Sequence, residues 1–355
     1  MTITIDPANA ARTVSVFFCF VTSLLACVEP GSETAKPDST VLSRSAPVVT
    51  SARVNQGTYG MRSTIKWMFS PDSSAILVMV DPVGVENEPV PNGFFYGSES
   101  RNFQTRMDGI WDVAPSPDWG TIAFSRAHVV SGRGEDSIPP ALWTDLARRT
   151  GMDTATLING SFASSAMALA KSIAQPGLIQ VPVDPRSSSA AEFATPRVFQ
   201  ITRGWRLRWT ADGGMVALGN NPARADDNED SESWAALDAK SGGFHGTLPE
   251  GAKLVAPRWI AGPTLEMSVP VDMQGARAIT IASGNRTFAI ESSRGVITAR
   301  ETTAGGNAAS APYSIGSGKA LAATKGGKYI LALAPRGNAV GNEVPVEAVV
   351  YIVGW

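Results

Sequence analysis

Phe69-Ser70-Pro71-Asp72-Ser73-Ser74-Ala75-Ile76-Leu77-Val78 is the stretch that decides the fold, because close variants of it recur. It returns as Pro115-Ser116-Pro117-Asp118-Trp119-Gly120-Thr121-Ile122-Ala123-Phe124 and as Trp209-Thr210-Ala211-Asp212-Gly213-Gly214-Met215-Val216-Ala217-Leu218. The second copy follows the first by about 46 residues, and the third follows after about twice that interval. The chain is therefore built from repeated supersecondary units.

A second landmark keeps the same interval. Leu142-Trp143-Thr144-Asp145-Leu146 precedes an Arg-Thr-Gly turn, and Ala235-Ala236-Leu237-Asp238-Ala239 precedes Lys240-Ser241-Gly242. Each lies about 27 residues after the Asp of its repeat. Two landmarks in one register make a chance repeat a poor explanation.

The residues of one unit predict a four-stranded antiparallel sheet. Pro presets φ in the turn, and the Asp that follows bonds nearby backbone groups. An apolar β-rich run comes next, such as Ala75–Val80 or Thr121–Ser125, and the Leu-Trp-Thr-Asp phrase predicts a third strand. A Lys/Arg-Ser/Thr-Gly turn then leads to a fourth strand.

In these phrases the chain resembles the WD40-like propeller repeats of the TolB type. Their pattern is an aromatic residue, Ser-Pro-Asp-Gly and an Ile-Ala-Phe-like strand. Eroded copies begin at Trp259-Ile260-Ala261-Gly262 and at Ala323-Thr324-Lys325-Gly326-Gly327-Lys328. The resemblance covers roughly residues 52–355. It implies an all-β propeller, a fold that hosts many functions and specifies no chemistry.

The spacing predicts six blades. Seven would fit if the interval 260–323 holds further strands at Ile279–Ile281, Phe288–Ile290 and Val296–Ala299. The segment from about Ala52 is expected to complete the last blade and to close the propeller, which removes exposed sheet edges. Since the chain stops at the expected closing strand, Val346–Val353, we expect no appended α/β-hydrolase domain.

The N-terminal region predicts export and anchoring. Val14–Val28 is apolar, and Leu24-Leu25-Ala26-Cys27 resembles the lipobox of bacterial lipoproteins, with Cys27 as the lipidated residue. The alternative is a short uncleaved anchor. We therefore divide the chain into a signal or anchor at 1–27, an extended tether at 28–55 and a propeller at 56–355, held at a bacterial membrane in the periplasm.

Composition and motifs argue against catalysis. The net charge of −2 gives no basic field for nucleic acid. The histidines, His128 and His245, lie far apart, and no nucleophile elbow, haem motif or phosphate loop is present. The repeated acids Asp72, Asp118 and Asp212 are interpreted as turn formers. We expect no enzyme activity.

One acidic loop offers alternating oxygen ligands. Its candidates for calcium are Asp226, Asn228, Asp230 and Glu232. The loop departs from the EF-hand pattern, with Ser231 at the glycine position and Leu237 at that of the bidentate Glu. A solvated acidic loop is the other interpretation, and no other cofactor is expected.

Acidic loops between second and third strands are expected on one face of the propeller. This predicted docking face comprises Glu86, Glu88, Phe94, Phe95, Tyr96, Glu135, Asp136, Asp226 and Asp227. The sequence thus favours a non-catalytic scaffold, an extrinsic subunit that braces an integral membrane complex of photosynthetic or respiratory type. The alternatives are a TolB-like periplasmic module that binds a peptide or an envelope partner, and a propeller hydrolase or lyase.

Overall fold

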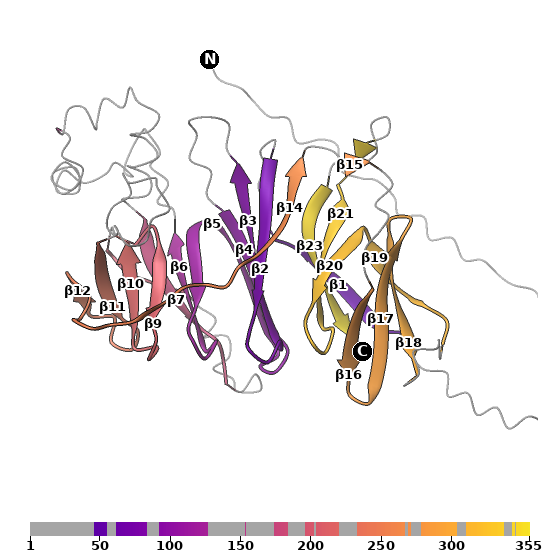
Figure 1. Ribbon diagram of the computed structural model, residues 1–355, viewed down its shortest axis with the longest axis horizontal. Coiled ribbons are helices and arrows are strands. Elements are labelled where there is room, and N and C mark those ends of the chain that lie inside the picture. Colours follow the sequence, from indigo (N-terminus) through magenta and orange to yellow (C-terminus); the bar gives the residue numbers. More distant parts are fainter. Residues whose placement is uncertain are drawn as a thin grey trace, which may run out of the picture. The chain divides into compact units, whose positions relative to one another are not determined.

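The computed structural model shows an all-β protein built of antiparallel sheets (Figure 1). The chain divides into two units, residues 1–45 and 46–355. The described residues are 46–54, 62–83, 92–126, 153, 174–183, 196–201, 204–219, 233–266, 269–270, 278–303, 310–336, 343–344 and 346–355. Within these ranges no helix is long and apolar enough to cross a membrane.

The first repeat copy lies at the hairpin between the first two strands of a meander. Its strands are β2 (Arg62–Phe69), β3 (Ala75–Val83), β4 (Asn92–Ser98) and the first half of β5 (Phe103–Pro115). The next meander starts in the second half of β5 and continues with β6 (Thr121–Arg126), β7 (Gln175–Gln180) and β8 (Arg197–Val198).

Strand β5 joins the two meanders by changing partners at a bulge. Residues 103–107 pair with β4, whereas residues 112–115 pair with β6. Gly109 lies between these halves with a φ of 76°, a conformation that glycine adopts without a steric penalty. The outermost strand of one sheet thereby becomes the first strand of the next.

Three further sheets follow. The third contains β9 (Leu207–Thr210), β10 (Met215–Gly219), β11 (Trp234–Asp238) and β12 (Phe244–His245), with β13 (Leu254–Val255) added beside β9. The fourth contains β16 (Ile279–Ser283), β17 (Arg286–Ser293), β18 (Val296–Thr302) and β19 (Tyr313–Ser317). Strands are therefore present at the three positions that the alternative of seven blades requires.

The last sheet joins the two ends of the described unit. It contains β20 (Lys319–Ala323), β21 (Tyr329–Pro335), β23 (Val346–Gly354) and β1 (Val48–Arg53). Val48 pairs with Gly354 and Arg53 with Val349, so an N-terminal strand completes the last sheet as predicted, but it lies at residues 48–53 and does not start at about Ala52. The predicted tether at 28–55 is wrong at its end, because residues 48–53 gain a strand partner in β23. A short pair, β15 (Val269–Pro270) with β22 (Glu343–Val344), completes the described strands.

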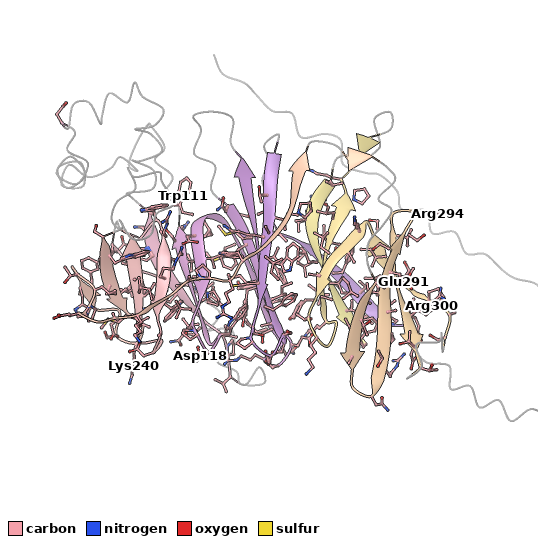
Figure 2. The ribbon with its side chains drawn as sticks, viewed as in Figure 1. Trp111, Asp118, Lys240, Glu291, Arg294 and Arg300 are labelled. Atoms are coloured by element: carbon pink, nitrogen blue, oxygen red, sulfur yellow. The ribbon has the colours of Figure 1, made fainter. Side chains whose placement is uncertain are left out.

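Four turns share one hydrogen-bonding pattern. In the first, the Ser70 hydroxyl donates to Asp72 Oδ1 at 2.6 Å and accepts from the Ala75 amide at 2.9 Å. The Ser74 amide donates to the same carboxylate oxygen at 3.1 Å. The turns at Asp118 and Asp212 repeat all three bonds, with Ser116 and Thr210 as the hydroxyl residues. The interpretation of the repeated acids as turn formers is confirmed, and Figure 2 shows Asp118 at its turn.

The fourth turn lacks its acid and receives one from another sheet. Thr324 occupies the hydroxyl position, but Gly326 stands where the other copies have Asp. Glu99, in the turn between β4 and β5, accepts from the Thr324 hydroxyl, and its Oε1 accepts from the Lys328 amide at 2.8 Å. Its Oε2 accepts from the Gly326 amide at 3.0 Å. This arrangement, the Glu99 latch, ties the last sheet to the first.

One predicted landmark does not mark a sheet as expected, and another lies outside the described residues. The eroded copy at Trp259 forms no hairpin of its own, because β14 (Ile260–Glu266) pairs with β2 instead. The phrase at Leu142–Leu146 lies outside the described residues, and the strand beside β6 is β7, about 30 residues later. The matching phrase at Ala235–Ala239 is confirmed as part of β11.

The Glu99 latch predicts that Gly326→Asp stabilises the protein when Glu99 is absent and destabilises it when Glu99 is present. Replacing Glu99 with Ala should lower the free energy of unfolding by about 2 kcal/mol, because three donors lose a charged acceptor. Gly326→Asp in that background should restore most of the loss, since Asp then sits as in the other turns. A urea titration of each variant measures both effects.

The same Gly326→Asp change should destabilise the protein when Glu99 is present. A Cβ at residue 326 would meet Glu99 Oε2, and two carboxylates would compete for one set of donors. Equal effects of Gly326→Asp in both backgrounds would contradict the latch.

The turn acids also predict how stability depends on pH. Their hydroxyl partners, Ser70, Ser116 and Thr210, hold the pKa of Asp72, Asp118 and Asp212 below the usual value. Below about pH 4 the unfolded chain binds more protons than the folded one, so the free energy of unfolding decreases as the pH is lowered. Denaturant unfolding between pH 7 and pH 3 should show this loss, and it should be smaller in Asp72→Asn.

Candidate functional site

The first strands of three sheets meet at one place. Strand β5 packs against β9, and the Trp209 indole donates to the Ala114 carbonyl at 2.9 Å between them. Strand β2 belongs to the same continuous sheet as β5. The turns that end these strands lie close together, because residues of the first two turns line one cavity with Trp209 and the second turn approaches Gly213 of the third.

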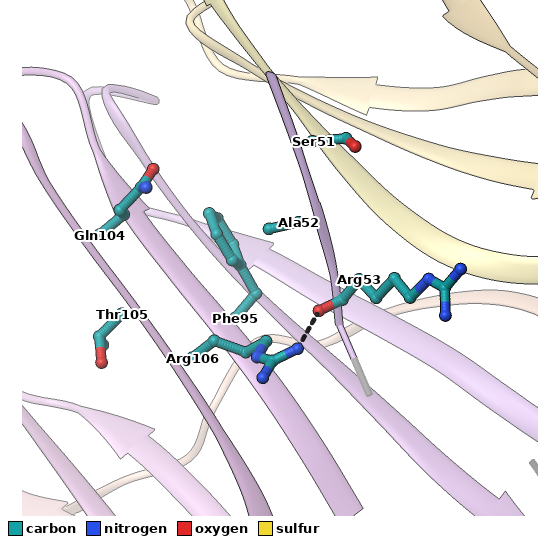
Figure 3. Close-up of a pocket in the computed structure, with 7 residues that line it drawn as sticks. All are labelled: Ser51, Ala52, Arg53, Phe95, Gln104, Thr105 and Arg106. Carbon is teal, nitrogen blue, oxygen red and sulfur yellow. Dashed lines mark hydrogen bonds between the residues drawn. The ribbon is translucent and has the colours of Figure 1, made fainter. Parts of the chain in front are cut away.

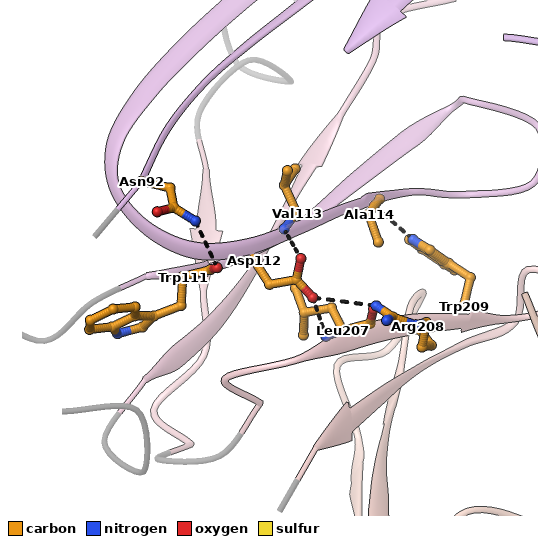
Figure 4. A network of polar contacts seen from close by, with 8 residues as sticks. All are labelled: Asn92, Trp111, Asp112, Val113, Ala114, Leu207, Arg208 and Trp209. Carbon is orange, nitrogen blue, oxygen red and sulfur yellow. Dashed lines mark hydrogen bonds and ion pairs between the residues drawn. The ribbon is translucent and has the colours of Figure 1, made fainter. Parts of the chain in front are cut away.

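A charged network holds β5 to β9 (Figure 4). Asp112 Oδ2 accepts from the Leu207 amide at 2.8 Å and lies 3.5 Å from Arg208 Nη1. The Asp112 and Arg208 side chains are only 15% and 10% exposed. Asp112 Oδ1 also accepts from the Val113 amide at 2.9 Å.

Burial dominates the electrostatics of this network. Desolvation raises the pKa of Asp112 above its usual value, and the Arg208 cation opposes that rise. The Lys66 cation on β2 opposes it less strongly. Three first strands thus contribute charge to one place, but only Asp112 contributes a carboxylate.

The crossing segment, residues 254–266, runs from β9 to β2. Its first two residues pair with β9 as β13, and its last seven pair with β2 as β14. Residues 256–259 between them form no strand. Lys66 Nζ lies 5.0 Å from the centroid of the Trp259 ring, within the range of a cation–π contact.

A cavity of about 370 Å³ lies beneath the crossing segment. We call it the junction cavity. Its walls are mostly apolar and come from the strand ends, the repeat turns and the crossing segment: Met68, Phe69, Pro71, Ala114, Pro115, Ser116, Pro117, Trp119, Trp209, Val255, Ala256, Pro257 and Arg258. Nothing in the repeat pattern indicated that a later segment would run from β9 to β2.

The structure does not support the predicted docking face where it can be compared. Phe94, Phe95 and Tyr96 are 0%, 1% and 0% exposed, because β4 lies between β3 and β5 and its side chains fill the core on both faces. Phe95 lines a groove, described below, and Tyr96 lines a second pocket beside the turns at Asp72 and Asp118. The remaining predicted site residues lie outside the described ranges: Cys27, Glu86, Glu88, Glu135, Asp136, Asp226, Asp227, Asn228, Asp230 and Glu232.

The hairpin between β11 and β12 brings Asp238, Ser241 and His245 near one another. Asp238 Oδ1 accepts from the Ser241 amide at 2.6 Å and from the Ser241 hydroxyl at 2.7 Å, which lowers the pKa of Asp238. The Ser241 hydroxyl therefore donates to the acid and is not paired with the imidazole as a nucleophile. Among the described residues, no group of three or more His, Cys, Asp or Glu side chains could hold a metal ion.

No protein-family model matches the chain, and no curated protein matches it. Solved structures similar to it include the β-propeller domain of the Trilobed protease from Pyrococcus furiosus, with 10% identity over 77% of this chain and 67% of that one, and a TM-score of 0.25. Uncomplexed Pyrococcus horikoshii acylaminoacyl peptidase has 9% identity over 77% and 37%, with a TM-score of 0.25. The AtxE2 isopeptidase has 10% identity over 86% and 51%, with a TM-score of 0.28.

These likenesses correct one expectation. The proteins found are peptidases and an isopeptidase, so the non-catalytic scaffold predicted from the sequence is contradicted, and the alternative of a propeller hydrolase agrees with them better. The chain spans about a third to a half of the length of the last two. At TM-scores of 0.25 to 0.28 the likeness carries no argument about mechanism or substrate.

The Asp112 network predicts a large cost of truncation. Asp112→Ala should lower the free energy of unfolding by about 3 kcal/mol, because it removes the carboxylate beside a buried guanidinium and the acceptor of the Leu207 amide. The matched control is Asp108→Ala on the same strand, whose side chain is 35% exposed, with an expected change below about 0.5 kcal/mol. Guanidinium chloride titration measures both, and equal effects would contradict the assignment.

Proposed function

We propose that the protein binds an extended peptide at the junction cavity and serves as the propeller of a peptide hydrolase. The observation that carries the proposal is the crossing segment. Val255-Ala256-Pro257-Arg258 is an extended, proline-containing stretch of chain that forms one wall of a largely apolar cavity at the junction of three sheets. In this view, the chain's own segment occupies the position of a peptide ligand.

The crossing segment is partly exposed, as expected of a stretch of chain that an added peptide displaces. Val255 is 41% exposed and Ile260 is 46% exposed, so much of its apolar surface faces solvent. It is anchored at both ends, by β13 on β9 and by β14 on β2. A proline-containing peptide is stiff and loses little entropy when it binds in an extended form.

The cavity offers the groups that such a peptide needs. Trp119 and Trp209 supply flat apolar surface for a proline ring or an aliphatic side chain. Trp209 is held in place by its bond to the Ala114 carbonyl. Ligand sites typically combine such apolar walls with a few polar groups.

The hydrolytic groups are not assigned. Asp112 is the acid of the described network, and its bonds to backbone amides and to Arg208 give it a structural role. The proposed contribution of the described sheets is therefore to admit and hold the peptide.

A peptide titration tests the proposal. Acetyl-Leu-Val-Ala-Pro-Arg-amide copies residues 254–258 and contains no tryptophan, so binding is read from the protein's own tryptophan emission. We expect a saturable change with this peptide and a weaker one with a scrambled sequence. Mass spectrometry of the peptide after incubation with the full chain reports whether cleavage accompanies binding.

Pro257→Ala provides the matched variant. It loosens the chain's own segment in the site, so the added peptide should bind about fivefold more tightly, because a larger fraction of the protein is competent to bind. Equal affinity for the scrambled peptide, or no saturable change in emission, would rule out the proposed site.

A further inference from the structure

A groove lies between the outer edges of the last and first sheets (Figure 3). It holds about 470 Å³ and is lined by Ser51, Ala52 and Arg53 of β1, Phe95 of β4 and Gln104, Thr105 and Arg106 of β5. We call it the edge groove. Strand β1 ends one sheet, and the first half of β5 pairs with β4 alone among the described strands.

The backbone of β1 points hydrogen-bonding groups into the edge groove. The Val54 amide donates to the Ala348 carbonyl at 3.0 Å, so residue 54 bonds β23, and residues 51 and 53 alternate to the opposite side. The Arg53 carbonyl confirms this direction, because it accepts from Arg106 Nη1 at 3.3 Å. Since alternation has a period of two, the amide and carbonyl of Ser51 share the same open edge.

A side chain spans the groove where a backbone ladder could form. The bond between the edges comes from the Arg106 guanidinium, which substitutes for the amide donor of a neighbouring strand. Open strand edges are templates for an added strand, and main-chain bonds of this kind supply affinity for extended peptides. A backbone N–H of an incoming strand would donate to the Arg53 carbonyl in place of the Arg106 guanidinium.

The charges of the groove select the occupant. The Arg106 guanidinium lies in the groove and faces the Arg53 carbonyl, whereas the Arg53 guanidinium points away from it (Figure 3). Arg53 pairs with the buried Glu347 at 3.1 Å, and Arg106 lies 3.8 Å from Asp108. Phe95 and Ala52 provide an apolar floor, so a strand that alternates apolar and acidic residues matches both surfaces.

We propose that the edge groove binds an extended acidic peptide from another protein by strand addition to β1. This site is separate from the junction cavity and does not rest on the function proposed for it. The peptide would pair with Ser51 and Arg53 through its backbone and place a carboxylate near the Arg106 guanidinium.

Fluorescence polarisation with a labelled peptide tests the proposal. The probe is Val-Glu-Val-Glu-Val-Glu, about as long as β1, and the control is Val-Lys-Val-Lys-Val-Lys. We expect saturable binding of the acidic probe, at least tenfold tighter than that of the lysine peptide. An acidic probe with N-methyl groups on alternate residues of one edge should lose at least tenfold in affinity, whereas methylation of the other edge should have little effect.

Two substitutions of Ser51 distinguish a contact with its backbone amide from a contact with its side chain. Ser51→Pro removes an outward amide without breaking the ladder to β23 and should weaken the acidic probe at least fivefold, whereas Ser51→Ala should leave it unchanged. Arg106→Glu should abolish the preference for glutamate over lysine. Circular dichroism checks that each variant is folded, and the N-methyl probes decide the question if Ser51→Pro is not.

Three results would overturn the proposal: no saturable binding of the acidic probe, equal binding of the lysine peptide to the unaltered protein, or equal affinity of the two N-methylated probes. Binding that survives Ser51→Pro in a folded variant would also place the peptide elsewhere.

Discussion

One carboxylate sets the geometry of each repeat turn. It accepts a hydrogen bond from a Ser or Thr hydroxyl and another from a backbone amide. The hydroxyl in turn accepts the amide five residues after it, so one acid orders the hairpin between first and second strands. The residue after the acid position has a φ of 56° to 73° in all four copies, an otherwise costly conformation. The sheets and their junctions are built outward from these turns.

The sequence predicts the features that depend on neighbouring residues or on the spacing of the repeat. The repeated acids, the strands beside them and the closing pair of β1 with β23 follow from residues a few positions apart or from spacing. It missed what depends on distant partners. Gly326 gave no sign that Glu99, more than two hundred positions earlier, would supply the absent carboxylate, and Trp259 gave no sign that its segment would pair with β2. The aromatic run at Phe94–Tyr96 is predicted on a docking face, but its side chains are buried because β4 pairs with β3 on one side and β5 on the other.

The candidate sites arise where the repeat is broken. The crossing segment replaces an expected hairpin and so forms a wall of the junction cavity. The edge groove arises because β5 leaves β4 at Gly109 to start the next sheet, which exposes the edge of its first half beside β1. Regular copies specify the fold, and the departures create surfaces that a peptide can use.

Amide hydrogen exchange in Glu99→Ala tests most directly the claim that one carboxylate organises each turn. We predict that the Lys328 amide exchanges at least tenfold faster than in the unaltered protein, because it loses its acceptor. The Ser74 and Gly120 amides, which donate to their own acids, should keep their rates. An unchanged Lys328 amide, or equal acceleration at all three, would contradict the account.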